Sequence, residues 1–143
     1  MSSARLIVCE KTGVWATAMR RTMSGSGYRV HEVRSLAQCF DALADHPASF
    51  VTLELTAANR ELIPRAIVRM GIQYPAARAI VVGERGLEGG QWLLREAGAI
   101  DVLFSPRQIS AAGRLAGRHL AAVPEEEMTL RDLIWSRIPW SNL

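Results

Sequence analysis

Five short apolar runs alternate with longer amphipathic segments along most of this chain. The apolar runs lie at residues 5–9, 28–33, 50–55, 78–83 and 100–104. Segments with apolar side chains at helical spacing follow them, at residues 13–23, 36–44, 59–70, 87–97 and 108–122. This alternation predicts a parallel sheet with right-handed crossovers and helices on both faces. Four of the runs are almost wholly apolar, as expected of strands covered on both faces, whereas 28–33 alternates.

Capping and breaking residues predict where the helices begin and end. Thr12 and Ser35 precede amphipathic segments, and we expect each to cap a helix N-terminus. Asn59 is expected to begin the third helix, and Gly71 and Pro75 to end it. The Ser-Gly repeat at 24–27 follows a helix and precedes a strand, which is the reverse of a phosphate-binding loop. It is therefore interpreted as a helix stop and turn.

The length and composition fit one globular domain in a reducing compartment. The chain has 143 residues, of which 49% are hydrophobic and 22% charged. No apolar run approaches the roughly 18 residues of a membrane span, and the N-terminal apolar stretch is too short for a signal peptide. Two cysteines, Cys9 and Cys39, are too few for a disulfide framework. We therefore expect a cytoplasmic protein that does not associate with membranes.

The basic residues do not predict a nucleic-acid surface, although the net charge is +3. Sixteen of the 17 basic residues are arginine, and they are scattered along the chain, with the longest pure run at Arg20–Arg21. Binding to nucleic acid is kept as an alternative, and salt-sensitive association with DNA would indicate it.

No motif predicts a metal site, a cofactor or a catalytic residue. His31, His46 and His119 lie far apart and lack ligand spacing, and no cysteine-histidine cluster exists. The sequence also lacks the Gly-x-Ser-x-Gly pattern of serine hydrolases. An enzyme is therefore not expected.

Sites in open parallel sheets form beyond the carboxyl ends of the strands. The chain resembles the receiver (CheY-like) domain of two-component response regulators over about residues 4–122. The resemblance is carried by Leu-Ile-Val-Cys-Glu at 6–10, Val-Thr-Leu-Glu-Leu at 51–55, Ile-Val-Val-Gly at 80–83 and Ala-Gly-Ala-Ile-Asp-Val-Leu-Phe-Ser-Pro at 97–106. It implies a flavodoxin-like (βα)5 three-layer sandwich, with a parallel five-stranded sheet of order 2-1-3-4-5. Residues 1–123 would form this domain, and residues 124–143 a C-terminal amphipathic extension.

The chain departs from the family pattern at the positions that carry phosphorylation. Receivers have two magnesium-binding acids after the first strand, where this chain has Cys9 and Glu10. Glu54 replaces the phosphate-accepting aspartate, and Gly83 replaces a serine or threonine that contacts the phosphoryl group. Val102 replaces the switch aromatic residue.

The fifth strand is followed by a further departure. Ser105 replaces the lysine that pairs with the phosphoryl group, and Pro106 keeps its identity. The chain is therefore interpreted as a degenerate receiver without a phosphorylation site.

These substitutions remove the chemistry of phosphoryl transfer. Cys9 is a poor ligand for Mg²⁺, which takes oxygen ligands. Without the lysine and the hydroxyl, the positive charge and hydrogen bonding that stabilise the transition state are missing. Glu54 is open to two interpretations, an imitation of a phosphorylated aspartate or a drifted acidic position. Cys9 is likewise either a reactive thiol or a small buried apolar residue.

The extension carries apolar side chains at helical spacing. Glu125–Glu127 suit a helix N-terminus. The candidate interaction residues are Leu130, Leu133, Ile134, Trp135, Ile138 and Trp140. This segment either packs back on the domain or contacts a second copy or a partner.

The expected function is that of a receiver-like signalling module that works without phosphorylation, through a protein partner or self-association. A dimer could form through the last core helices or the extension. Two alternatives stay open. One is a ligand- or redox-responsive switch around Cys9, Glu10 and Glu54, and the other is a nucleic-acid-binding module.

Overall fold

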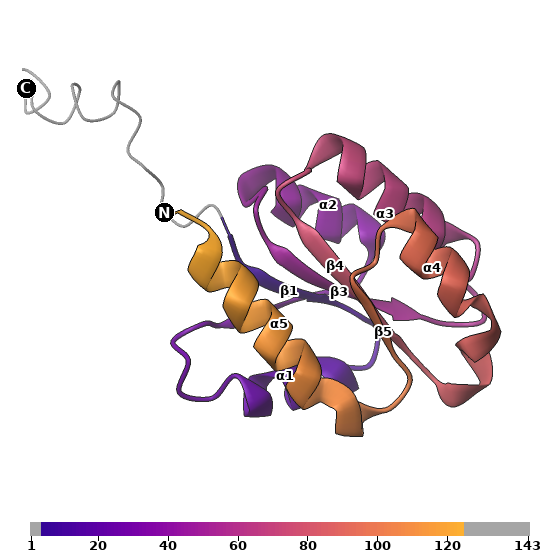
Figure 1. Ribbon diagram of the computed structural model, residues 1–143, viewed down its shortest axis with the longest axis horizontal. Coiled ribbons are helices and arrows are strands. Elements are labelled where there is room, and N and C mark those ends of the chain that lie inside the picture. The colour runs from indigo at the N-terminus through magenta and orange to yellow at the C-terminus, as the bar shows by residue number, and fades with distance from the viewer. Residues whose placement is uncertain (1–3, 125–143) are drawn as a thin grey trace, which may run out of the picture.

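A computed structural model describes residues 4–124 as a five-stranded sheet between two layers of helices (Figure 1). The strands are β1 (Leu6–Cys9), β2 (Val30–Val33), β3 (Phe50–Leu55), β4 (Arg78–Gly83) and β5 (Asp101–Leu103). The α-helices are α1 (Val14–Thr22), α2 (Leu36–Asp45), α3 (Leu62–Gln73), α4 (Gln91–Ala97) and α5 (Ile109–Ala122). Two short 3-10 helices, η1 (Arg85–Gly90) and η2 (Pro106–Gln108), precede α4 and α5.

The sheet confirms the predicted topology. Its strand order is β2-β1-β3-β4-β5, and every neighbouring pair is parallel. The register places Leu6 beside Phe50, and Phe50 beside Arg78. Because all strands run the same way, their carboxyl ends meet at one edge of the sheet, and the loops that leave them form that edge.

Two hydrophobic cores lie on opposite faces of the sheet. Ile7 and Val51 pack with α2, α3 and α4, whereas Val8 and Phe50 pack with α1 and α5. The residues alternate between the cores because successive side chains of a strand point to opposite faces. The two helix layers of Figure 1 follow from this division, since each buries one apolar stripe against the sheet.

Two helix starts differ from the prediction. Gly13 stands at the N-cap of α1 with a positive φ of 88°, and neither it nor the expected Thr12 provides a side-chain cap. Asn59 does not begin α3, because its amide closes the turn before the helix by accepting from the Thr56 N–H at 2.7 Å. Ser35 does cap α2, accepting from the Gln38 N–H at 3.2 Å.

Three further boundaries also move. Gly71 does not end α3, which continues to Gln73, because an exposed glycine keeps its helical hydrogen bonds and Pro75 is the first residue that cannot continue the helix. The alternating run at 28–33 forms a strand only from Val30, since Gly27 lies just before it in a turn with φ of 85°. The helix expected from Leu87 begins at Gln91, because the glycines of η1 favour a turn.

The extension lies outside the described residues. Its six candidate interaction residues, Leu130 to Trp140, therefore stay predictions, and so does the boundary between residues 123 and 124.

A buried hydroxyl in the centre of the sheet offers a test of the packing. Thr52 is fully buried between Val8 and Ile80, and its Oγ1 has no hydrogen-bond partner in the described structure. Thr52→Val should therefore raise the free energy of unfolding in urea by about 1 kcal/mol, since burying an unpaired hydroxyl is unfavourable. Thr52→Ser is the control and should be destabilising, because it keeps the hydroxyl and leaves a cavity. A loss of stability in Thr52→Val would contradict this assignment.

Candidate functional site

A cleft of about 830 Å³ lies at the carboxyl edge of the sheet. Four of the seven positions that match the receiver phosphorylation pocket line it: Glu54, Gly83, Ser105 and Pro106. The other three, Cys9, Glu10 and Val102, do not line it. The topology explains this meeting, because the four residues end or follow β3, β4 and β5, which are neighbours in the sheet.

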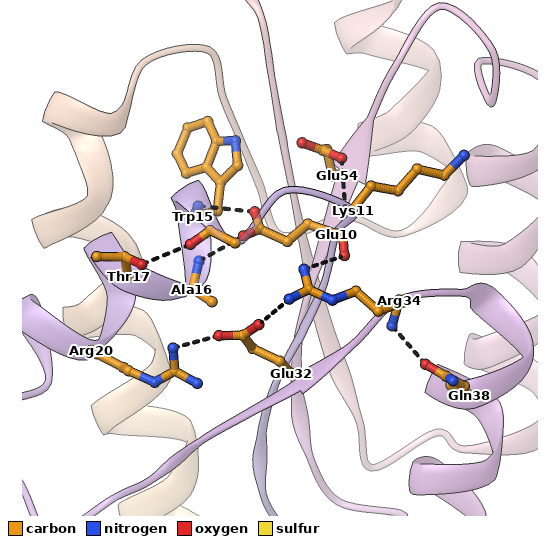
Figure 2. A network of polar contacts seen from close by, with 11 residues as sticks. Glu10, Lys11, Trp15, Ala16, Thr17, Arg20, Glu32, Arg34, Gln38 and Glu54 are labelled. Carbon is orange, nitrogen blue, oxygen red and sulfur yellow. Dashed lines mark hydrogen bonds and ion pairs between the residues drawn. The ribbon is translucent and has the colours of Figure 1, made fainter.

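The Glu10 carboxylate is held beneath the first turn of α1 (Figure 2). Its Oε2 accepts from the Trp15 N–H at 2.9 Å, and its Oε1 accepts from the Ala16 N–H at 3.1 Å. The left-handed turn at Gly13, which favours glycine, brings the chain from β1 into this helix. A negative charge at a helix N-terminus is favourable, and two backbone donors are satisfied at once. Glu10, only 2% exposed, thus acts as the cap that Thr12 was expected to provide.

Charged side chains from β2, α1 and the loop after β2 surround this turn, as Figure 2 shows. Glu32 of β2 pairs with Arg20 of α1 and, at 2.8 Å, with Arg34. Arg34 also donates to the backbone carbonyl of Glu10 at 3.3 Å. These contacts tie β2 to both α1 and the end of β1, and they keep the two arginines close to an acid.

Glu54 is joined to its surroundings mainly through its backbone. The Glu54 carbonyl accepts from the Asn59 side-chain amide at 2.8 Å, which fixes the loop after β3. The Glu54 carboxylate makes one long contact, accepting from the Lys11 N–H at 3.4 Å. Its side chain is partly exposed at the cleft, so it is the more accessible of the two predicted carboxylates.

Gly83 and Ser105 close two sides of the cleft. A Cβ atom at Gly83 would lie 3.2 Å from the Leu55 carbonyl oxygen and 3.4 Å from the Leu55 Cβ. Any larger residue would therefore press on the neighbouring strand β3. The Ser105 hydroxyl accepts from the Arg107 N–H at 3.3 Å and caps η2, so it takes part in a turn.

Cys9 and Val102 belong to the core beneath α2, α3 and α4. The Cys39 thiol of α2 hydrogen-bonds the Cys9 sulfur, and both cysteines are buried. This hydrogen bond lowers the pKa of Cys9, against the opposing effects of burial and of the nearby Glu54 and Glu10 carboxylates. The same bond and burial raise the pKa of Cys39. Cys9 is thus a buried residue paired with a second thiol.

The cleft contains polar residues that the sequence did not identify as site residues. Thr12 and Thr56 line it, as do Arg85 and Arg107. The two arginines follow β4 and β5 within four residues. Considering the four residues after each predicted strand as site candidates would have found both arginines, because the loops at the carboxyl edge of the sheet bring such residues together.

The arginines that have identified contacts lie in both helix layers. Arg20 in α1 pairs with Glu32, Arg95 in α4 pairs with Asp101, and Arg69 in α3 lies 4.2 Å from the centre of the Phe40 ring. Local contacts therefore account for several of the scattered positive charges.

Within residues 4–124, no three histidine, cysteine or acidic side chains are placed to hold a metal ion. No helix in the same range is long and apolar enough to cross a membrane.

No protein-family model matches this sequence, and no curated protein matches it. The fold, in contrast, is similar to solved structures. A response regulator from Thermotoga maritima aligns with 85% of this chain and all of its own length, at a TM-score of 0.71 and 14% identity.

The chain has the receiver fold. An atypical orphan response regulator, described as having a phosphorylation-independent regulatory mechanism, aligns with 85% of this chain and 99% of its own, at a TM-score of 0.68 and 15% identity. A pilus assembly-related protein from Burkholderia pseudomallei aligns with 81% of this chain and 90% of its own, at a TM-score of 0.57 and 21% identity. At these identities the likeness shows the receiver fold, with its flavodoxin-like strand order.

The Glu10 cap predicts a large cost for removing this carboxylate. Glu10→Ala should lower the free energy of unfolding by about 3 kcal/mol, because two buried N–H groups lose their acceptors at about 1–3 kcal/mol each. Urea denaturation measures the loss. Glu54→Ala is the matched control, and it should change stability by less than about 0.5 kcal/mol because its side chain has one long contact. Equal losses in the two variants would contradict the capping role.

The thiol pair predicts an order of chemical modification. Iodoacetamide should label Cys9 before Cys39, because the thiolate is the reacting form and the Cys9 pKa is the lowered one. Each unit of pKa difference changes the thiolate fraction about tenfold. Mass spectrometry of timed samples gives both rates, and the urea-unfolded chain serves as the control. Labelling of Cys39 first would show that the hydrogen bond runs the other way.

Proposed function

We propose that this chain is a receiver-like signalling module of the cytoplasm that works without phosphorylation and acts by binding a protein partner. The observation that carries the proposal is the state of Glu10. Both oxygens of this carboxylate accept backbone hydrogen bonds from α1, and the side chain is buried away from the cleft. The surviving acid after β1 is thus engaged in stabilising a helix, and a metal ion would have to compete with that helix for it.

The remaining positions support the same proposal. Gly83 offers no hydroxyl, and the close approach of Leu55 leaves little room for one. Ser105 stands where receivers have a lysine, and its hydroxyl caps η2. The cleft does hold positive charge in Arg85 and Arg107, but these residues sit in the loops beyond the matching positions. The interpretation of Glu54 as a phosphate mimic stays a prediction.

The structural neighbours support a signalling role without chemistry of its own. Receiver domains are signalling modules, and one neighbour is described as an atypical orphan regulator that works independently of phosphorylation. We infer that this chain likewise transmits information through a contact surface and has no enzymatic activity.

Treatment with acetyl phosphate and Mg²⁺ tests the proposal. We expect no mass increase of one phosphoryl group and no Mg²⁺-dependent change in tryptophan fluorescence, although Trp15 lines the cleft. A receiver with an intact phosphorylation pocket, treated in parallel, is the positive control and should gain the phosphoryl group. Modification of Glu54 would falsify the proposal.

A partner should be captured in the same way with and without acetyl phosphate. The tagged full chain is incubated with lysate of its native cell in both conditions, and bound proteins are compared by quantitative mass spectrometry. Retention that depends on acetyl phosphate would contradict phosphorylation independence, and the absence of any specific partner would contradict a binding role.

A ligand-responsive switch is the second candidate, and the cleft itself favours it. Its volume of about 830 Å³ lies within the range of small-molecule sites, and Arg85 and Arg107 would suit an anionic ligand. A library of metabolite anions in a thermal-shift assay tests this, since a ligand that binds the folded state raises the melting temperature. Arg85→Ala should abolish a genuine shift.

A further inference from the structure

An apolar groove of about 660 Å³ runs between α3 and α4 on their outer side. Val68 and Ile72 of α3 form one wall, and Leu93 and Ala97 of α4 form the other. The charged residues Arg65, Arg69 and Glu96 also line it. The chemistry of this groove differs from that of the cleft described above, because most of its exposed wall is aliphatic.

The wall residues are unusually exposed for their type. Ile72 is 76% exposed, Val68 is 48% exposed and Leu93 is 46% exposed. The inner face of α3 is already satisfied, since Ile63 and Ile67 are buried against the sheet. α3 therefore has a second apolar stripe that the described residues leave uncovered, and contiguous exposed apolar side chains mark interaction sites.

The sequence beyond Pro124 contains a matching stripe. Leu130, Ile134 and Ile138 recur every four residues, which places them on one line of a helix. The wall of α3 repeats at the same interval, from Pro64 through Val68 to Ile72. Both lines span eight residues, or about 12 Å of helix. This is the helix-in-groove pattern of recognition.

The charges of the two parts are complementary. Residues 125–143 hold four acidic and two basic side chains, whereas residues 4–124 hold fifteen basic and ten acidic ones. Arg65 and Arg69 line the groove together with Glu96, and Arg65 makes no ion pair within the described part of the chain. Glu125–Glu127 give residues 125–143 most of their negative charge.

The geometry of the fold also allows the contact within one chain. Helices that connect parallel strands run antiparallel to them, so α3, α4 and α5 all end at the amino edge of the sheet (Figure 1). Ile72 and Ala97 lie at that end of the groove. The six Cα–Cα steps from Pro124 to Leu130 span at most about 21 Å when extended. The segment therefore leaves α5 at the same edge of the sheet as the Ile72 end of the groove.

We propose that residues 130–140 of this chain dock into the groove between α3 and α4 of the same molecule, as a helix that ends before Pro139. Leu130, Ile134 and Ile138 face Val68, Ile72 and Leu93. The groove is thereby an intramolecular interaction surface.

Hydrogen–deuterium exchange of the full chain tests this docking. We expect the amides of residues 130–140 to be protected in the parent protein and to exchange at least tenfold faster in Ile72→Glu and in Leu93→Glu. A helix this short is marginal alone, so its protection depends on the groove. The control is Leu62→Glu, a residue of α3 that is 53% exposed and lies outside the groove, and it should leave the protection unchanged.

Three outcomes would overturn the proposal. Fast exchange of residues 130–140 in the parent protein shows that the segment is not docked. Protection that survives both groove substitutions places the segment elsewhere. Protection that disappears on dilution, together with a dimer in sedimentation experiments, assigns the groove to a second copy. Circular dichroism of each variant confirms that the exposed substitutions leave the domain folded.

Discussion

Parallel pairing of β1, β3 and β4 is the constraint on which the rest of the molecule depends. It requires a crossover helix between successive strands, and it buries both faces of the sheet, so that nearly every strand residue must be apolar. It also brings the chain turns after β3, β4 and β5 to one edge. The cleft exists because of this geometry, and its contents are set by the few residues that the turns carry.

One of those turns shows how the same residue type can serve two incompatible purposes. An acid after the first strand can be a metal ligand if it points across the edge, or a helix cap if it points under α1. The glutamate side chain is one methylene longer than that of aspartate, and Glu10 accepts from both the Trp15 and Ala16 N–H groups. The Glu10 carboxylate thus stabilises the start of α1 and does not line the cleft. The charged residues Arg85 and Arg107, from the segments after β4 and β5, line it instead.

The fold could be predicted from the sequence, whereas the use of individual site residues could not. Runs such as 78–83 are short, apolar and separated by segments with helical spacing. These features can be recognised from neighbouring residues in the sequence alone. The role of Glu10 depends on the φ angle of Gly13, and the pairing of Cys9 with Cys39 depends on how α2 lies on β1. Thr12 looked like a cap because serine-like hydroxyls favour such positions, but a carboxylate four residues before the helix reached its donors first. Arg85 and Arg107 were missed because the sequence places them in loops, and only the sheet brings those loops together.

The close contact between Gly83 and Leu55 has a consequence for anyone who wishes to rebuild a phosphate switch on this scaffold. A serine or threonine at position 83 would place its Cβ 3.2 Å from the Leu55 carbonyl oxygen, so this substitution presses on β3 where it pairs with β4. Shortening Glu10 to an aspartate withdraws a cap, and replacing Ser105 frees an N–H of η2. Each of these three substitutions therefore removes or strains a contact that this fold uses.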